Sequence, residues 1–529
     1  MKLNVSRFNI YSCLTLQNNN MQICFDPAKI MESDIDRISP DIIFISHESM
    51  DHMDPSQVYI LQKKKNCKIF CSIACAIDLT QAFPYDYEFI DSINALIPGA
   101  CVEYGKVVIE TKKSIHCDYM LPLIFKITFK DTNVSVLHCF DSLLSDDIVE
   151  FSKNTSLAII PLGIAKGVSA NSGLEFVQKL SSHRFITNHL KSKKELDLFK
   201  NLLNGKYPCT FLDWNESTEV ELEKIEYTKN SVLDLDFNDI FNNLDTIKKE
   251  HLISIASNIN CLKTDMVKNK SILNSLYSKY ANSNYEEKII LLCIFILISL
   301  LDSNLITSDI IENVKKDLSK ETSSENNNLH TVILLFLSVY AQQSGNIFGC
   351  KEAINLIDEK NEHNTYWVVE FLGRCIVSQK SSCENLINEF VKILKNTNIY
   401  NSVVVRRKIF WELYRIMKIM PSYTENFVNT FEDGLTDSNP DVELLATLCF
   451  GLANRVYDVN STQMKKIFDL LKDPEDDVRE ISVKTIRKLN NKDYILSKKS
   501  QLFELINDSN CHVQHEAQIT KKTVTEWEI

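Results

Sequence analysis

The sequence predicts an N-terminal α/β half followed by an all-α half. Up to about residue 203, short apolar segments alternate with helical segments. Beyond about residue 231 the strand patterns vanish, glycine becomes sparse and apolar residues recur at helical spacing. A chain of 529 residues is too long for one core. We therefore expect an α/β domain at 1–230, a helical region at 231–387 with divergent repeats as one option, and a repeat array at 388–529.

The composition is that of an ordinary globular protein, with 44% hydrophobic and 24% charged residues. The formal charge of -12 argues against a general nucleic-acid-binding surface, although a local basic groove remains an option. Because the sixteen cysteines form no Cys-x-x-Cys pair and no secretory signal opens the chain, we expect a reduced, cytoplasmic protein. The longest apolar run, 289–301, falls short of the roughly 20 residues of a membrane span and predicts a buried helix.

Short apolar segments bounded by turn residues predict the strands of the α/β half. In order they lie at 21–27, 42–45, 67–71, 102–111, 121–129, 133–140, 157–163 and 184–189, with a helix at 74–83 and a closing helix after residue 194. The carboxyl ends of buried strands form the edge at which open α/β sheets carry their chemistry. Polar residues at these ends are therefore the first candidates for a functional site.

The densest such cluster is Ser46-His47-Glu48-Ser49-Met50-Asp51-His52-Met53-Asp54, directly after the apolar segment 42–45. It holds two imidazoles and several carboxylates within eight residues. Imidazole and carboxylate groups suit zinc, manganese or iron, and side chains that fan out from one tight loop can reach one ion from several directions. The stretch therefore predicts a metal-binding loop.

The stretch resembles the signature of the metallo-β-lactamase fold superfamily, His-x-His-x-Asp-His, in the variant with a further Asp two residues later. That variant occurs in the branch that contains ascorbate-6-phosphate lactonase and N-acylphosphatidylethanolamine phospholipase D. Here it runs His47-x-Ser49-x-Asp51-His52-x-Asp54, so Ser49 stands where the motif has its second His. The resemblance implies an αββα metallo-β-lactamase-like sandwich for the N-terminal half.

The resemblance extends to later strand ends in the family's order. His116 falls between two strands where the family has its next metal His, Asp141 matches the Asp that bridges two metals, and His189 ends a strand at the position of the last metal His. The alternative for a lone His such as His116 is that it is structural or merely exposed to solvent. Phe140 stands where the family usually has Gly and would narrow the pocket. His138 is expected either to pack in the core or to support the ligands from behind.

By family role, His47 and His116 would hold a first metal, while Asp51, His52 and His189 hold a second. Asp141 would bridge them, and Asp51 and Asp141 would be the catalytic carboxylates. Asp26, Ser49 and Asp54 would support the ligands from behind; for Asp26 a plain turn role is the alternative. Lys166 and Lys191 would contact a small anionic substrate, with a solvated loop lysine as the alternative.

The resemblance implies one or two ions per chain, Zn2+ or Mn2+. Because a hydroxyl is a poorer ligand than an imidazole, Ser49 should weaken the first position. One ion with an open position is still enough to activate water. We expect a hydrolase of a phosphate ester, phosphodiester or lactone. The alternative is a catalytically degenerate sensor or scaffold whose helical array carries the function.

Three stretches in the last part of the chain repeat with periods of 36 and 35 residues, at 435–442, 471–479 and 506–513, and a weaker copy lies at 394–406. Each predicts a helix, a turn capped by Asp or Asn, and a second helix. Such units must stack to bury their apolar faces. The pattern resembles HEAT repeats, which implies a solenoid surface for a protein partner; an array that closes an oligomer is the alternative. The polar stretch 302–328 predicts a loop.

Overall fold

The computed structural model describes residues 1–116, 121–162, 169–189, 193–225, 248–259, 270–320, 326–358, 361–379 and 383–527. The chain divides into two compact units, Met1–Leu305 and Ile306–Ile529. Strands are confined to the first unit, and the described part of the second is helical. The predicted order, an α/β half before an all-α half, is therefore confirmed.

The first sheet of unit 1 has the order β14-β1-β2-β3-β4-β5-β6. Its strands are β1 (Lys2–Arg7), β2 (Leu14–Gln17), β3 (Gln22–Phe25), β4 (Ile42–Ile45), β5 (Lys68–Ser72), β6 (Ile93–Leu96) and β14 (Ser217–Glu221). The strands from β14 to β3 pair antiparallel, whereas β3 to β6 pair parallel. The carboxyl ends of β3 and β4 therefore lie at the same edge.

The second sheet has the order β13-β12-β11-β10-β9-β8-β7. Its strands are β7 (Cys101–Tyr104), β8 (Val107–Lys113), β9 (Leu123–Phe129), β10 (Val134–His138), β11 (Thr155–Pro161), β12 (Ser182–Asn188) and β13 (Cys209–Thr210). Antiparallel pairing from β7 to β10 gives way to parallel pairing from β10 to β13. This arrangement brings the carboxyl ends of β10 and β12 to one edge.

The two sheets share one apolar core. Phe44 of β4 packs against Phe125 of β9, with ring centroids 5.0 Å apart, and the backbone N–H of Leu123 donates to the carbonyl of Ser46 at 3.1 Å. The latter bond joins the two sheets directly beside the predicted metal loop. The loops at the carboxyl ends of both sheets are thus held next to one another.

Helices flank the two sheets of unit 1. They are α1 (Glu32–Ile35), α2 (Pro55–Lys65), α3 (Ile73–Ala82), α4 (Tyr87–Ser92), α5 (Asp146–Phe151), α6 (Ala170–Lys179) and α7 (Lys193–Leu203). Further along the chain, α9 (Lys249–Ser257), α11 (Lys270–Asn282) and α12 (Tyr285–Leu301) complete the unit. Of these, α9 contacts β6 and β7, and α12 contacts α3. The predicted buried helix at 289–301 is therefore present within α12.

Three details differ from the sequence-based expectations. The segment 102–111 forms a hairpin of β7 and β8 rather than one strand, because Gly105 adopts φ +54° at its turn. The stretch 302–328 is not simply a loop, since it contains α13 (Ser308–Leu318). Phe140 does not narrow a pocket, because it is buried in the core against Phe25 and Phe125.

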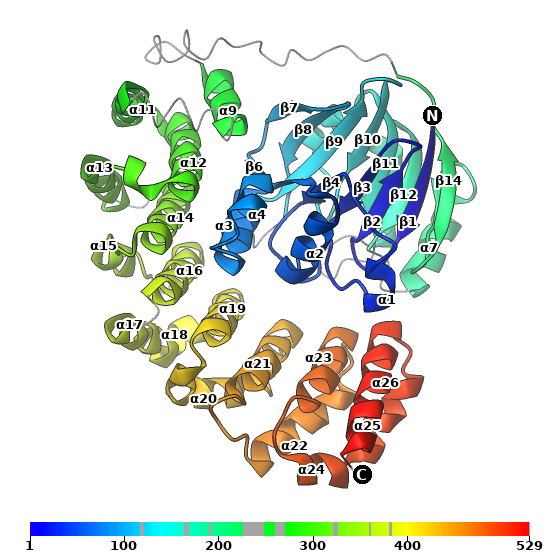
Figure 1. The fold of residues 1–529 in the computed structure, drawn as a ribbon, viewed down its shortest axis with the longest axis vertical. Helices are drawn as coiled ribbons and strands as arrows, with labels where there is room; N and C mark the ends of the chain where they lie inside the picture. Colours follow the sequence, from blue (N-terminus) through cyan, green and yellow to red (C-terminus); the bar gives the residue numbers. More distant parts are fainter. Residues whose placement is uncertain are drawn as a thin grey trace. The chain divides into compact units, whose positions relative to one another are not determined.

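Unit 2 consists of paired helices in chain order (Figure 1). They are α13, α14 (Asn326–Ser344), α15 (Cys350–Ile354), α16 (Glu362–Gln379), α17 (Glu384–Lys395), α18 (Thr397–Tyr400), α19 (Val403–Ile419), α20 (Thr424–Gly434), α21 (Pro440–Ala453), α22 (Ser461–Asp469), α23 (Asp476–Ile486), α24 (Lys492–Ser497), α25 (Lys499–Glu504) and α26 (Cys511–Glu526). Each of α14, α16, α19, α21, α23 and α26 packs against the next in this series. The unit is therefore a stack of nearest neighbours.

Charged contacts link the copies of the repeated pattern. The guanidinium of Arg406 donates to both carboxylate oxygens of Asp437, at 2.6 and 3.1 Å. The same bidentate pair recurs two repeats later, where Arg479 donates to both oxygens of Asp508, at 2.8 and 2.9 Å. At the position between them, Glu443 takes the place of the Arg, and burial together with Asp473 raises the pKa of Glu443 to about 7. The series of Arg–Asp pairs between neighbouring repeats is therefore interrupted at Glu443.

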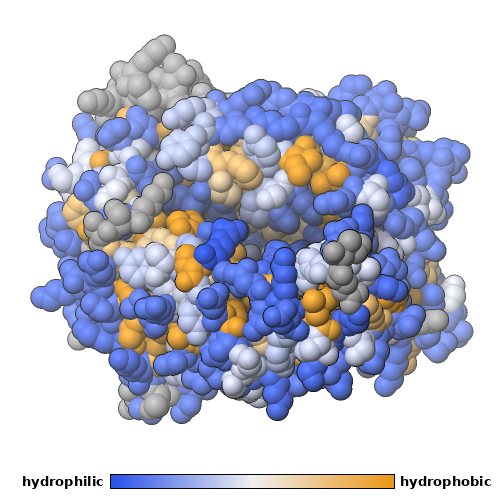
Figure 2. Space-filling model, turned by 60° about the horizontal axis from the view of Figure 1, so that its bottom comes forward, coloured by the Kyte–Doolittle hydropathy of each residue, from blue (hydrophilic) through white to orange (hydrophobic). Residues whose placement is uncertain are grey.

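The described helices include none that is long and apolar enough to cross a membrane. Figure 2 shows a face on which hydrophilic residues predominate and hydrophobic residues lie in small separate groups.

Candidate metal centre

The metal loop is shaped by its own backbone and by the helix that follows it. After β4 the chain turns through hydrogen bonds from the N–H groups of His52 and Met53 to the carbonyl of Ser49, at 2.9 and 2.8 Å. Asp54 then caps α2, accepting from the backbone N–H groups of Ser56 and Gln57, with Pro55 at the first helical position. The turn and the cap fix the direction in which His52 points.

His52 lies between two carboxylates. Its Nδ1 is 2.5 Å from Oδ2 of Asp26, and its Nε2 is 3.0 Å from Oδ2 of Asp141. Asp26, fully buried at the end of β3, also accepts hydrogen bonds from the backbone N–H and the hydroxyl of Ser46, at 2.8 and 2.9 Å. Because Asp26 accepts the Nδ1 proton, Nε2 is the nitrogen available to a ligand.

The first group of ligand atoms comes from Asp51, His52, Asp141 and His189, all within 4.8 Å of one another. Nε2 of His189 lies 3.3 Å from Oδ2 of Asp51 and 3.5 Å from Oδ2 of Asp141. His189 reaches this point from the carboxyl end of β12 with φ +61°, a left-handed conformation uncommon for a residue with a side chain. Strand ends of both sheets thus contribute to one cluster.

The second group is His47, His116 and Asp141, which meets the same 4.8 Å limit. The rings of His47 and His116 lie 5.0 Å apart edge to face, and Nε2 of His116 is 4.0 Å from Oδ2 of Asp141. The His116 segment is tied to the Asp141 segment, because the N–H of Ile115 donates to the hydroxyl of Ser142 at 2.8 Å. Asp141 belongs to both groups.

The electrostatics favour a neutral imidazole at His47 and the presence of a positive charge at His52. Burial, with the neighbouring His52 and His116, lowers the pKa of His47 well below its ordinary value, so its lone pair is available at neutral pH. Burial alone would also lower the pKa of His52, but the surrounding carboxylates, Asp141 foremost, raise it well above its ordinary value. A positive charge is therefore stabilised beside Nε2 of His52.

The residues present fit a divalent ion. Asp141 is buried, yet its Oδ1 has no hydrogen-bond partner among the described residues. A buried carboxylate oxygen without a partner is costly unless a cation or water satisfies it. The two groups together offer four imidazoles and two carboxylates, the donors that zinc and manganese take. An ion would be held by Asp51, His52, Asp141 and His189, and a second by His47, His116 and Asp141.

Two of the predicted supporting residues contact ligand residues, and the third, Asp54, caps a helix. Asp26 contacts His52, as described, and the hydroxyl of Ser49 donates to Oδ1 of Asp51. Asp54 caps α2, and its carboxylate accepts hydrogen bonds from backbone N–H groups of that helix. His138 is buried and stacks on Phe140 in the core, 3.7 Å between centroids. Lys166 and Lys191 fall outside the described residues.

The sequence reasoning missed a loop that borders the site. Residues 8–13, between β1 and β2, place the hydroxyl of Ser12 3.3 Å from Nε2 of His52 and the ring of Tyr11 5.8 Å from that of His189. No motif marks these residues. Their position follows from β1, whose partner β14 lies more than two hundred residues away in the sequence.

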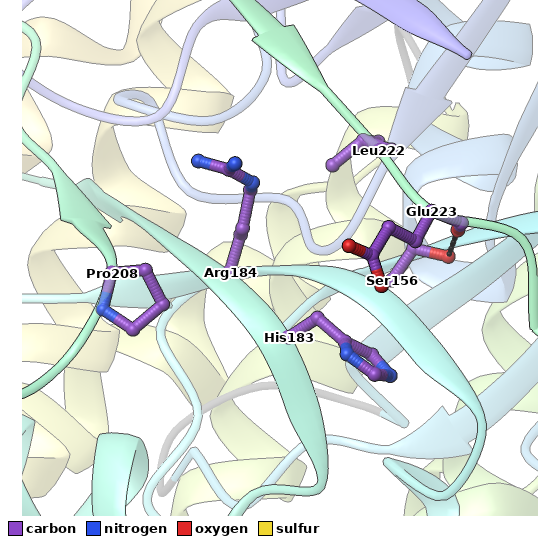
Figure 3. A pocket seen from close by; sticks show the side chains of 6 residues that line it. All are labelled: Ser156, His183, Arg184, Pro208, Leu222 and Glu223. Carbon is purple, nitrogen blue, oxygen red and sulfur yellow. Dashed lines mark hydrogen bonds between the residues drawn. The ribbon is translucent and has the colours of Figure 1, made fainter.

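A separate pocket of about 220 Å³ lies at the amino ends of β11 and β12, lined by Ser156, His183, Arg184, Pro208, Leu222 and Glu223 (Figure 3). The hydroxyl of Ser156 donates to the carbonyl of Glu223 at 3.0 Å. The candidate metal ligands lie at the carboxyl ends of the strands, so this pocket is at the other edge of the second sheet.

Neither a family model nor a curated protein matches the chain. Solved structures that are similar to its N-terminal part include the following three. The metallo-beta-lactamase fold protein YhfI from Bacillus subtilis is 17% identical, with 41% of this chain and 99% of that chain covered and a TM-score of 0.35. A metal-dependent hydrolase from Parabacteroides distasonis is 16% identical, with 40% and 92% covered and a TM-score of 0.34. The short form of human tRNase Z is 11% identical, with 41% and 98% covered and a TM-score of 0.32.

Proposed function

We propose that the chain is a metal-dependent hydrolase that uses Zn2+ or Mn2+, one or two ions per chain, to cleave a phosphate ester, a phosphodiester or a lactone. The observation that carries this proposal is the convergence of six side chains from separate strand ends into two groups of ligand atoms that share Asp141. Such a convergence of imidazoles and carboxylates is characteristic of metal-assisted hydrolysis.

When bound, a divalent ion supplies Lewis acidity, which lowers the pKa of a water molecule and polarises a substrate oxygen. The protein's own groups orient the reactants. Asp51, held by the hydroxyl of Ser49 and facing His189, is placed to accept a proton from the attacking water. Asp26 keeps His52 in the tautomer that presents Nε2 to the site. Asp141 belongs to both groups, so its carboxylate can serve both positions.

The two positions differ in the number of ligands. Four residues form the group around His52, and three form the group around His47. Ser49 hydrogen-bonds to Asp51 in the position where the motif has its second His. We therefore assign tight binding to the four-residue group and weak binding to the other.

Metal analysis combined with a hydrolysis assay tests this function. The purified chain should contain at least one equivalent of zinc or manganese and hydrolyse bis(p-nitrophenyl) phosphate. The double variant Asp51→Ala, His52→Ala should lose both metal and turnover. His183→Ala is the matched control, because this exposed His of the same unit lies at the other edge of the second sheet. Absence of metal and of turnover in the unaltered chain would refute the proposal.

The second candidate function is a sensor or scaffold that binds metal without turnover. The loss of an imidazole at Ser49 favours it, and it predicts metal in the preparation with no hydrolysis above the double variant. In both cases we assign partner binding to the HEAT-like helical array of residues 388–529, whose stacked helices provide a continuous surface. A pull-down experiment tests that role. It compares the unaltered array with a variant in which Val403 and Val404, two exposed residues of α19, are changed to Asp.

A further inference from the structure

The loop of residues 8–13 forms one wall of the candidate metal centre. Ser12, fully buried, lies with its hydroxyl 3.3 Å from Nε2 of His52. The backbone N–H of His189 donates to the carbonyl of Tyr11 at 3.0 Å, and the Tyr11 ring meets the His189 ring edge to face. Two adjacent residues of this loop therefore touch two of the four residues in the larger ligand group.

Buried polar groups fix this wall in place. The side-chain oxygen of Asn9 accepts from the backbone N–H groups of Tyr11 and Cys13, at 2.9 and 3.0 Å, while its amide donates to the carbonyl of Ala28 at 2.6 Å. The guanidinium of Arg7 donates to the carbonyls of Leu212, at 2.9 Å, and of Ile10. A loop held by this many bonds presents its side chains with little freedom, as a binding wall requires.

The segment after β3 brings a positive charge to the same wall. Asp26 and Lys29 both have left-handed backbones, with φ +42° and +49°. Such conformations are costly for residues with side chains and concentrate at functional sites. They place the carboxylate of Asp26 against His52 and the ammonium of Lys29 3.0 Å from the hydroxyl of Tyr11, 4.3 Å from the centroid of its ring. One short segment thus supplies a carboxylate behind His52 and a cation on the Tyr11 ring of this wall.

We infer that Lys29, positioned by Tyr11, binds the anionic group of the substrate, a phosphate or a carboxylate. This inference rests on the proposed function, since it assigns the substrate class of the same site. Asp51 and Asp141 repel an anion that approaches the ligands, and the ammonium of the half-buried Lys29, which lies on the Tyr11 ring that contacts His189, offsets that repulsion. Lys29 takes the role that the sequence assigned to Lys166 and Lys191.

Phosphate binding tests this inference apart from turnover. The chain is loaded with zinc, freed of excess metal and titrated with inorganic phosphate in a calorimeter. Lys29→Met keeps the length of the side chain and removes its charge, and should weaken phosphate binding about tenfold or more, the usual worth of a hydrogen bond to a charged group. Lys29→Arg should restore most of the binding. Tyr11→Phe removes only the positioning hydroxyl and should give a smaller loss.

Lys153→Met is the matched control, because it removes an exposed lysine of the same unit that pairs with Glu150. It should leave phosphate binding unchanged. Kinetics with bis(p-nitrophenyl) phosphate should show KM raised in Lys29→Met with a smaller change in kcat. Equal phosphate binding by Lys29→Met and the unaltered chain, or no phosphate binding at all, overturns the inference. Lys29-dependent phosphate binding without any turnover supports the anion site and refutes the hydrolase.

Discussion

Replacing Asp26 by Asn should weaken metal binding without unfolding the protein. Asp26 accepts three hydrogen bonds, one from Nδ1 of His52 and two from Ser46. An Asn side chain can keep the bond from the Ser46 backbone, but it presents an N–H donor to Nδ1 of His52. His52 must then carry its proton on Nε2, the nitrogen that faces Asp141 and His189. A protonated Nε2 cannot bind a metal.

The expected magnitude follows from the loss of this one contact. Removing the partner that orients a metal-binding His costs about 10- to 100-fold in metal affinity. That loss corresponds to roughly 1.4 to 2.7 kcal/mol of binding free energy. Asp26 is fully buried, and Asn has nearly the same volume, so we expect no cavity and a folded variant.

Competition with a chromophoric chelator measures the affinity of each variant for zinc, and circular dichroism of the chelated protein checks the fold. Asp54→Asn is the matched control. Asp54 belongs to the same loop but caps α2, and Asn caps helices as well as Asp does. Unchanged zinc affinity in Asp26→Asn, or an equal loss in Asp54→Asn, contradicts the assignment of His52 as a ligand through Nε2.

Four further substitutions, at three positions, test other parts of the structure. Ser49→His should raise the metal content measured by atomic emission, since it restores an imidazole to the weaker position; unchanged content means that residue 49 does not face it. Glu443→Arg should raise Tm by about 2–4 °C because the new Arg pairs with Asp473. No rise in Tm would argue against the idea that an Arg–Asp pair is missing at this position. The pKa of Glu443 is raised to about 7. Ionisation of this carboxyl group therefore destabilises the fold as the pH rises from the ordinary pKa of a Glu towards 7. Glu443→Gln should therefore stabilise more at pH 8 than at pH 5 in thermal melts. Arg479→Ala should cost about 1–3 kcal/mol in urea unfolding because it leaves the carboxylate of Asp508 without its bidentate partner; a cost near zero would mean that this contact is dispensable.

The cluster of candidate metal ligands could be predicted because each of its residues stands beside an apolar strand. His47 and Asp51 follow β4, Asp141 follows β10 and His189 follows β12, and parallel strands bring their carboxyl ends to one edge. Nothing comparable marks Ser12, Tyr11 and Lys29. Their place at the site depends on how β1 and β2 join the first sheet, which is fixed by pairing across distant parts of the chain.

The fold shows the same division between local and non-local signals. The strand at 42–45 was predicted to the residue, since four buried apolar residues form a continuous run. The hairpin of β7 and β8 was missed because its turn is only Gly105 and Lys106 within an otherwise strand-like stretch. Helix α13 was missed because it lies in a polar stretch and buries one face only, with Ile310, Ile311, Val314 and Leu318.

The position of a bound ion tests the central claim most directly. Crystals of the chain loaded with manganese or zinc, measured at the absorption edge of the metal, should show an anomalous peak in contact with Nε2 of His52, Nε2 of His189 and the carboxylates of Asp51 and Asp141. A weaker second peak should lie between His47 and His116. A loaded crystal without a peak among these side chains, or with its peaks only elsewhere on the protein, contradicts the metal centre and the hydrolysis built on it.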